Sequence, residues 1–144
     1  MKAEPIIIER TCDAPPDRIW AAITEKEQMK VWYFDLAEFK ARVGFEFQFL
    51  AGKPEKKWLH LCRVTEVVPG KKLTHSWRYD GREGISYVTF ELIKEGNQTL
   101  VRLTHKGIET FPQDDPDFAR ENFVQGWTHI IGTALKGYVE GKPV

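Results

Sequence analysis

From Phe34 to His105 the sequence alternates between apolar and polar residues with a period of two. This alternation is typical of antiparallel strands that bury one face of a sheet and expose the other. The middle of the chain is therefore predicted to form an antiparallel sheet. The alternating runs are separated by turn signals at Val43-Gly44, Gly52-Lys53-Pro54, Pro69-Gly70, Asp80-Gly81 and Gly96-Asn97.

Helical segments flank the alternating region. Ile6-Ile7-Ile8 predicts a first strand, and Ala14-Pro15-Pro16-Asp17 predicts the start of a helix, because proline is tolerated in a first turn. Thr24-Glu25-Lys26-Glu27 has the capping-box pattern and predicts a second short helix that ends near Trp32. After Asp115-Pro116 the apolar residues return to helical spacing, at Phe123, Trp127, Ile130, Ile131, Ala134 and Tyr138. The predicted order is one strand, two short helices, six antiparallel strands and one long helix, which is an α+β fold.

Composition narrows the function. The 144 residues suit a single domain, 1–144, and 21 Lys+Arg balance 21 Asp+Glu, which argues against nucleic acid as a partner. No apolar run approaches the roughly 18 residues of a membrane span, and the first residues do not resemble a secretion signal, so a cytoplasmic location is expected. Cys12 and Cys62 lack the spacing of a zinc site and are interpreted as buried thiols. We expect no cofactor.

Two hairpin turns predict which residues face each other. A two-residue turn at Gly96-Asn97 and a tight turn at Pro69-Gly70 each define a register, and slipping by one residue would exchange the two faces. The predicted pairs are Leu92–Val101, Phe90–Leu103, Val88–His105, Val64–His75, Cys62–Trp77 and His60–Tyr79. Matching the buried faces of the other strands predicts the rows Phe45–Cys62–Trp77–Val88–His105 and Phe47–His60–Tyr79.

The inner face of this sheet carries three histidines and several large aromatic residues opposite a single helix. A curved sheet around one helix tends to leave space, and an apolar concavity with a few polar groups is the usual form of a small-molecule site. The alternative is that the aromatic residues simply fill the core. The candidate cavity residues are Trp32, Phe45, Phe47, Trp58, His60, His75, Trp77, Tyr79, Val88, Phe90, Leu103, His105, Phe123, Trp127 and Ile131.

The histidines do not form an obvious metal or catalytic centre. His60 and His105 are predicted on strands three apart, with about 4.8 Å between neighbouring strands, so they are too distant to share a metal, and His75 is predicted in a different row. No metal site is therefore expected. Acid–base catalysis by a cavity histidine stays open. However, Glu46 and Glu91 fall on the outer face, and no nucleophile motif is present.

Several segments resemble the START-like (SRPBCC) helix-grip superfamily, most closely the branch of the activator of the heat-shock-protein-90 ATPase. They are residues 12–24, 42–47, 64–73 with Trp77, 88–90 and 103–105, and Gly126-Trp127. The resemblance implies a birch-pollen-allergen-like fold, in which a seven-stranded curved antiparallel sheet grips the C-terminal helix around a hydrophobic cavity. Members include lipid and hormone carriers, polyketide cyclases, resistance proteins and chaperone activators, and fold alone does not determine which activity applies.

Together these observations predict a protein that binds a small hydrophobic or amphipathic ligand, lipid- or polyketide-like, as a monomer or weak homodimer. Trp32 is expected at the cavity entrance. Two alternatives stay open: a module that modulates a heat-shock-protein-90-type chaperone, and a cyclase- or hydratase-like enzyme. Apolar contact is expected from Trp58, Trp77, Phe47, Phe90 and Trp127, and polar contact from His60, Tyr79, His75 and His105.

Overall fold

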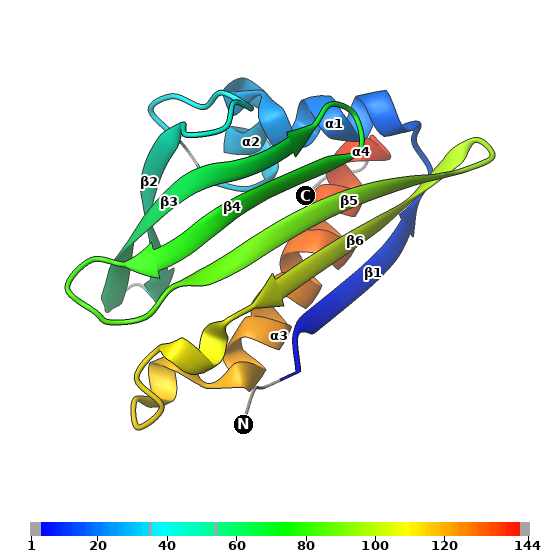
Figure 1. Ribbon diagram of the computed structural model, residues 1–144. Coiled ribbons are helices and arrows are strands. Elements are labelled where there is room, and N and C mark those ends of the chain that lie inside the picture. Colours follow the sequence, from blue (N-terminus) through cyan, green and yellow to red (C-terminus); the bar gives the residue numbers. More distant parts are fainter. Residues whose placement is uncertain (1–3, 35, 54, 142–144) are drawn as a thin grey trace.

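A computed structural model describes residues 4–34, 36–53 and 55–141, in which one antiparallel sheet curves around a C-terminal helix (Figure 1). The six strands lie in the order β1-β6-β5-β4-β3-β2. The α+β helix-grip prediction is therefore confirmed, with one strand fewer than expected in the described part. The strands are β1 (Ile6–Cys12), β2 (Glu46–Lys53), β3 (Lys56–Val68), β4 (Lys72–Tyr79), β5 (Ser86–Glu95) and β6 (Gln98–Lys106).

The expected seventh strand would have followed the second short helix, but the described residues between Phe34 and Gly44 form no strand. Leu36 and Phe39 are both buried there. They are three residues apart, so a strand would point them to opposite faces of the sheet. An irregular segment lets both side chains enter the core.

Helices α1 (Pro16–Thr24) and α2 (Lys26–Trp32) confirm the two predicted short helices. They pack at one end of the sheet, as the blue ribbons of Figure 1 show. The predicted capping box is wrong, because the Thr24 hydroxyl donates to the carbonyl of Trp20, 2.6 Å away, and Glu25 caps α2 without a side-chain hydrogen bond. None of the described helices is long and apolar enough to span a membrane.

The C-terminal helix begins later than predicted and is not uniform. Asp115-Pro116 starts only a short 3₁₀ turn, η2 (Pro116–Phe118), after a similar turn, η1 (Ile108–Thr110). The helix proper consists of α3 (Arg120–His129), a π-helical segment η3 (Ile130–Leu135) and α4 (Lys136–Val139).

The π segment matches the spacing of the side chains that face the sheet. In an α-helix every fourth residue drifts by about 40° around the axis. The i→i+5 bonds of a π-helix place more residues in each turn, so they counteract this drift. The predicted residues Ile130, Ala134 and Tyr138 are half-buried at the edges of this face. The buried residues recur at every fourth position: Phe123, Trp127, Ile131, Leu135 and Val139.

The β5–β6 hairpin has the predicted register. In the β3–β4 hairpin Val68 pairs with Lys72, so the turn contains three residues instead of the predicted two. A three-residue turn by itself would shift the register by one residue and exchange the two faces of the sheet. A β-bulge between Val64 and Glu66 reverses this shift, so Val64 faces His75 as predicted.

The other two registers differ from the prediction by two residues, which preserves the buried face. In β2–β3, Phe47 faces Cys62 and Phe49 faces His60, whereas Phe45 and Phe47 were expected in those places. In β4–β5, His75 faces Val88, where Trp77 was expected. The predicted turn at Gly52-Lys53-Pro54 includes Pro54, which lies outside the described residues. One consequence is a corrected row across the sheet: His75–Val88–His105.

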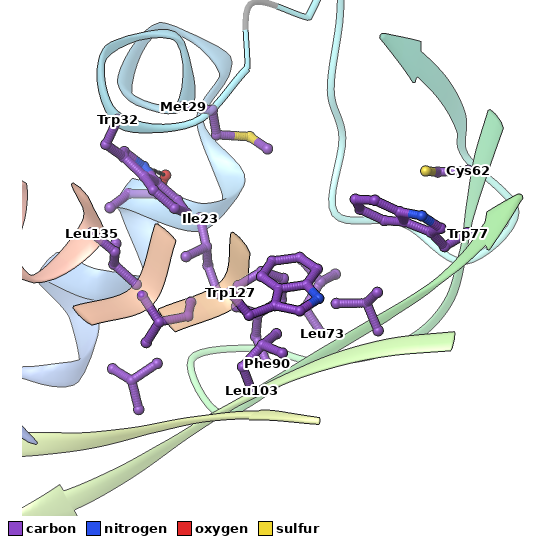
Figure 2. Close-up of a cluster of buried hydrophobic side chains, with 14 of the residues drawn as sticks. Ile23, Met29, Trp32, Cys62, Leu73, Trp77, Phe90, Leu103, Trp127 and Leu135 are labelled. Carbon is purple, nitrogen blue, oxygen red and sulfur yellow. Dashed lines mark hydrogen bonds between the residues drawn. The ribbon is translucent and has the colours of Figure 1, made fainter. Parts of the chain in front are cut away.

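The main core lies between the sheet and the three helical regions. Trp127 of α3 stands over sheet residues such as Phe90, while Met29 and Trp32 of α2 close the core from the other side (Figure 2).

The loop between β4 and β5 lies against η1, and substitution of Gly84 in this loop tests how close the contact is. Its φ is +99°, and an added Cβ would overlap the backbone carbonyl of Thr110. Gly81 in the same loop has a φ of +75° and open space around its Cα. We expect Gly81→Ala to lower the unfolding free energy by about 1–2 kcal/mol through backbone strain alone. Gly84→Ala should cost about 1–3 kcal/mol more. Urea denaturation measures both, and equal losses would contradict the overlap.

Candidate functional site

A cleft of about 250 Å³ opens between strands β2–β4 and the N-terminal part of the C-terminal helix. Its walls are mostly aromatic, and they come from the sheet, from the chain after α2, from η2 and from α3. Such a surface binds apolar and planar molecules well. The lining residues are Phe34, Ala51, Gly52, Trp58, His60, Trp77, Tyr79, Asp117, Phe118, Asn122, Phe123, Gly126, Trp127 and Ile130.

His60 is the histidine that borders this cleft. Its ring stacks on Phe49, with 4.6 Å between centroids, and its Nδ1 lies 2.9 Å from the carbonyl of Trp58. A carbonyl only accepts, so Nδ1 carries the proton. Burial lowers the pKa of His60 to about 4, despite opposing hydrogen bonds to the backbone. His60 is therefore neutral at physiological pH and offers the cleft a polar but uncharged ring.

His105 is held in a closed chain of hydrogen bonds. The indole Nε1–H of Trp127 donates to its Nδ1 at 2.9 Å, and an indole can only donate. The proton of His105 is therefore on Nε2, which donates to the Ser86 hydroxyl at 2.7 Å, and Ser86 donates to the carbonyl of Trp77 at 3.2 Å. Burial lowers the pKa of His105 to about 3. With both ring nitrogens engaged, His105 joins α3 to the sheet and does not act as a free base.

His75 lies deeper, beside a second and much smaller space that we call the inner pocket. Its Nδ1 donates to the carbonyl of Ser76 at 2.9 Å, and burial lowers its pKa to about 4. The inner pocket has a volume of about 10 Å³. It is lined by Ile23, Met29, Trp32, Tyr33, Phe39, Phe47, Leu73, His75 and Phe90.

The rim of the cleft is built on Trp58, which is half-buried. Lys56 Nζ and Arg82 Cζ each lie 4.7 Å from the centre of its ring, and Lys56 also forms an ion pair with Asp117 at 2.7 Å. Cations over an aromatic face are attracted by the ring quadrupole. Trp32, expected at the entrance, is instead 5% exposed, and its Nε1 donates to the carbonyl of Ala22.

The structure divides the predicted cavity residues into three groups. The largest group lines the cleft, another lines the inner pocket, and the rest lie in the core away from both spaces, except that Phe45 is half-buried. The cleft contains Trp58, His60, Trp77, Tyr79, Phe123 and Trp127. The inner pocket contains Trp32, Phe47, His75 and Phe90. The remaining residues are Phe45, Val88, Leu103, His105 and Ile131.

Some cleft residues were not predicted. Phe34 and Phe118 lie in irregular or 3₁₀ segments, where no periodic pattern indicates which way a side chain points. Asn122 and Gly126 lie on α3, one turn apart. A glycine in the middle of a helix costs about 1 kcal/mol relative to alanine, and this cost singles out Gly126 in the sequence, although it was not among the predicted cavity residues.

No group of three His, Cys, Asp or Glu residues that could hold a metal ion occurs in the described part of the chain. Within the sheet, His75 and His105 are two strands apart in one row, and His60 lies on the next strand beyond His75.

The comparisons with known proteins agree with this architecture. The family model described as activator of Hsp90 ATPase homolog 1-like protein matches residues 13–140. No curated protein matches the chain. A crystal structure of a protein from Chromobacterium violaceum is 26% identical, with a TM-score of 0.77, covering 94% of this chain and 96% of that one.

Two further solved structures share the fold. The solution structure of the Aha1 dimer from Colwellia psychrerythraea has 21% identity and a TM-score of 0.69, covering 96% of this chain and 97% of that one. A protein of the dynemicin biosynthetic locus has 18% identity and a TM-score of 0.77, covering 98% of this chain and 49% of that one.

The three buried histidines predict a pH-dependent stability. Their pKa values of about 4, 4 and 3 lie below the roughly 6.5 of an unfolded histidine. Between these values the unfolded chain binds protons that the folded protein does not, so stability is full above about pH 6.5 and falls as the pH drops toward 4. Each histidine contributes about 1.4 kcal/mol per pH unit in this window. We expect His60→Phe to reduce the slope of unfolding free energy against pH by about this amount. An unchanged slope in urea titrations would contradict the buried, neutral state of His60.

Proposed function

The chain belongs to the family of activator of Hsp90 ATPase homolog 1-like proteins, and we propose that it binds a small hydrophobic or amphipathic molecule in the aromatic cleft between the sheet and α3. The observation that carries this proposal is that the cleft stays open where the helix passes it. Gly126 faces the cleft, and a Cβ at this position would meet no other atom within 4 Å. Gly126 is exposed, so this position leaves the space beside the helix open to a ligand.

The size and chemistry of the cleft support the proposal. Its volume of about 250 Å³ is close to the lower end of small-molecule pockets, about 300 Å³, and a second hollow, which shares Trp58 and Gly126 with it and extends to Lys56 and Gln125, adjoins it. This arrangement suits a ligand with an apolar body inside and a polar end outside, beside the Lys56 and Arg82 side chains at the rim.

Two polar groups inside the cleft would orient such a ligand. Tyr79 accepts a hydrogen bond from the indole Nε1 of Trp77 at 2.9 Å, so its own O–H stays available to donate. Burial raises the pKa of Tyr79, which keeps this phenol protonated. The neutral ring of His60 lies next to it, with 4.8 Å between centroids.

The proposal is tested by filling the cleft. We expect the fluorescent apolar probe N-phenyl-1-naphthylamine to bind the wild type and Gly126→Leu to weaken that binding about tenfold or more, because the leucine occupies the cleft. The variant should fold at least as stably as the wild type, since a helical glycine costs about 1 kcal/mol.

A matched control places the same side chain on the solvent side of the helix. His129 is exposed, and His129→Leu should leave probe binding unchanged. Native mass spectrometry of gently purified protein then identifies any ligand that is retained from the cell. Equal binding by wild type and Gly126→Leu would contradict the proposed location.

A second candidate is modulation of an Hsp90-type chaperone, favoured by the family description. The outer face of the sheet offers a surface for it: a groove of about 470 Å³ over β2–β4, which includes Arg63, Arg78 and the partly exposed Ile85. This function predicts that the protein changes the ATPase rate of such a chaperone. It also predicts that Arg63→Glu with Arg78→Glu abolishes the change while Gly126→Leu does not. An ATPase assay with no effect from the wild type would exclude it.

The cyclase or hydratase alternative gains less support. It requires a histidine that water and substrate can reach, and the exposed fractions of His60, His75 and His105 are 6%, 2% and 0%. His105 also has both ring nitrogens occupied.

A further inference from the structure

The hydroxyl of Tyr33 is buried and has no hydrogen-bond partner among the residues that the structure describes. Tyr33 follows the last residue of α2, and its N–H donates to the carbonyl of Met29 at 2.7 Å, which holds the residue in place. Its ring packs between Trp32 and Phe34, with centroid distances of 4.8 and 4.2 Å. Buried polar side-chain atoms are paired in the large majority of native proteins, so an isolated hydroxyl needs a specific explanation.

Tyr33 lines the inner pocket, which is otherwise almost entirely apolar. The pocket volume of about 10 Å³ is close to the space of a single oxygen atom or water molecule. His75 is the other polar residue in its wall, and its Nδ1–H is already used by the carbonyl of Ser76. Burial raises the pKa of Tyr33 well above its usual value, so the phenol stays protonated. Among the side chains that line this pocket, Tyr33 therefore carries the hydroxyl that has no partner in the described chain.

Aromatic side chains connect the lining of the inner pocket with the lining of the cleft. Phe34 of the cleft stacks on Phe49 at 4.1 Å, and Phe49 stacks on His60 at 4.6 Å. On the sheet, Trp77 of the cleft lies 6.2 Å from His75 of the inner pocket, measured between ring centroids. Phe49 also lies 6.2 Å from Tyr33 and 6.5 Å from Phe47 of the inner pocket, so its ring stands between the two spaces and a ligand that reaches Tyr33 has to displace it.

We propose that Tyr33 is the inner anchor of the ligand site, and that its hydroxyl donates a hydrogen bond to an acceptor oxygen at the buried end of an apolar ligand. The inference rests on the proposed function and adds a ligand class: a molecule with a ketone, ester or similar carbonyl oxygen at the end that enters first. The pocket has room for one such oxygen, and its apolar walls exclude a charged carboxylate, because burying an unpaired charge is far more costly than burying a carbonyl that accepts a hydrogen bond.

The test compares pairs of ligands that differ in one atom group. Displacement of N-phenyl-1-naphthylamine measures the affinity of each medium-chain methyl ketone, from octan-2-one to dodecan-2-one. The same assay measures the affinity of its isostere, in which a methylene group replaces the carbonyl oxygen. We expect Tyr33→Phe to lower the affinity for the ketone relative to its isostere by about fivefold, the value of one buried neutral hydrogen bond. Affinity for the isostere itself should hardly change. Tyr138→Phe is the control, because its hydroxyl contacts Gln28, outside both spaces.

Stability of the ligand-free protein gives a second measurement. Tyr33→Phe removes an unpaired buried hydroxyl, so we expect its melting temperature to rise above that of the wild type. An occupant that is only a bound water would give the opposite result: a lower melting temperature and an unchanged ratio of ketone to isostere affinity, which overturns the proposal.

The outcomes separate this inference from the proposed function. If neither compound of a pair displaces the probe from the wild type, ligand binding in the cleft fails and the anchor fails with it. If both compounds bind and Tyr33→Phe leaves their affinity ratio unchanged, the cleft binds ligands and Tyr33 is not the anchor. A ratio that falls in Tyr33→Phe, and not in Tyr138→Phe, supports the anchor.

Discussion

One helix has to cover the apolar face of a six-stranded curved sheet, and the rest of the structure depends on how it does so. The buried residues of the C-terminal helix recur at every fourth position, and the π segment η3 keeps them turned toward the sheet. The bond from Trp127 to His105 joins the helix to β6, the strand next to the edge strand β1. Trp127 and Leu135 of this helix pack in the core shown in Figure 2, whereas the cleft lies beside Gly126, nearer the N-terminal end of the helix.

The three inner histidines show how similar residues receive different roles from their surroundings. All three are neutral because burial lowers each pKa. His105 completes a chain of hydrogen bonds from α3 to β4, whereas His75 bonds to the adjacent backbone and His60 borders the cleft. Inside the aromatic walls the polar groups are therefore uncharged, whereas the charged groups Lys56, Arg82 and Asp117 lie around Trp58 at the rim. This suits a largely apolar ligand more than a highly charged one.

Much of the cleft could be predicted from sequence because the alternation identifies the buried face of each strand. Trp58, His60, Trp77 and Tyr79 were assigned to the correct face even though two registers differed by two residues, since a shift of two keeps every side chain on its side. The same shift moved His75 into the row of His105, which no local pattern could indicate. Phe34 and Phe118 were missed because they lie outside regular strands and α-helices.

The sequence alone determined six of the seven expected strands, the two short helices, the inner face and the family resemblance, because periodicity and turn residues act over a few neighbouring positions. Only the tertiary structure decided the registers of β2–β3 and β4–β5, the bulge after Val64, the π segment and the separation of the cleft from the inner pocket. It also decided that the Tyr33 hydroxyl is buried without a partner in the described chain. These features arise from contacts between segments that are distant along the chain, where the fit of whole side chains against a curved sheet outweighs local preference.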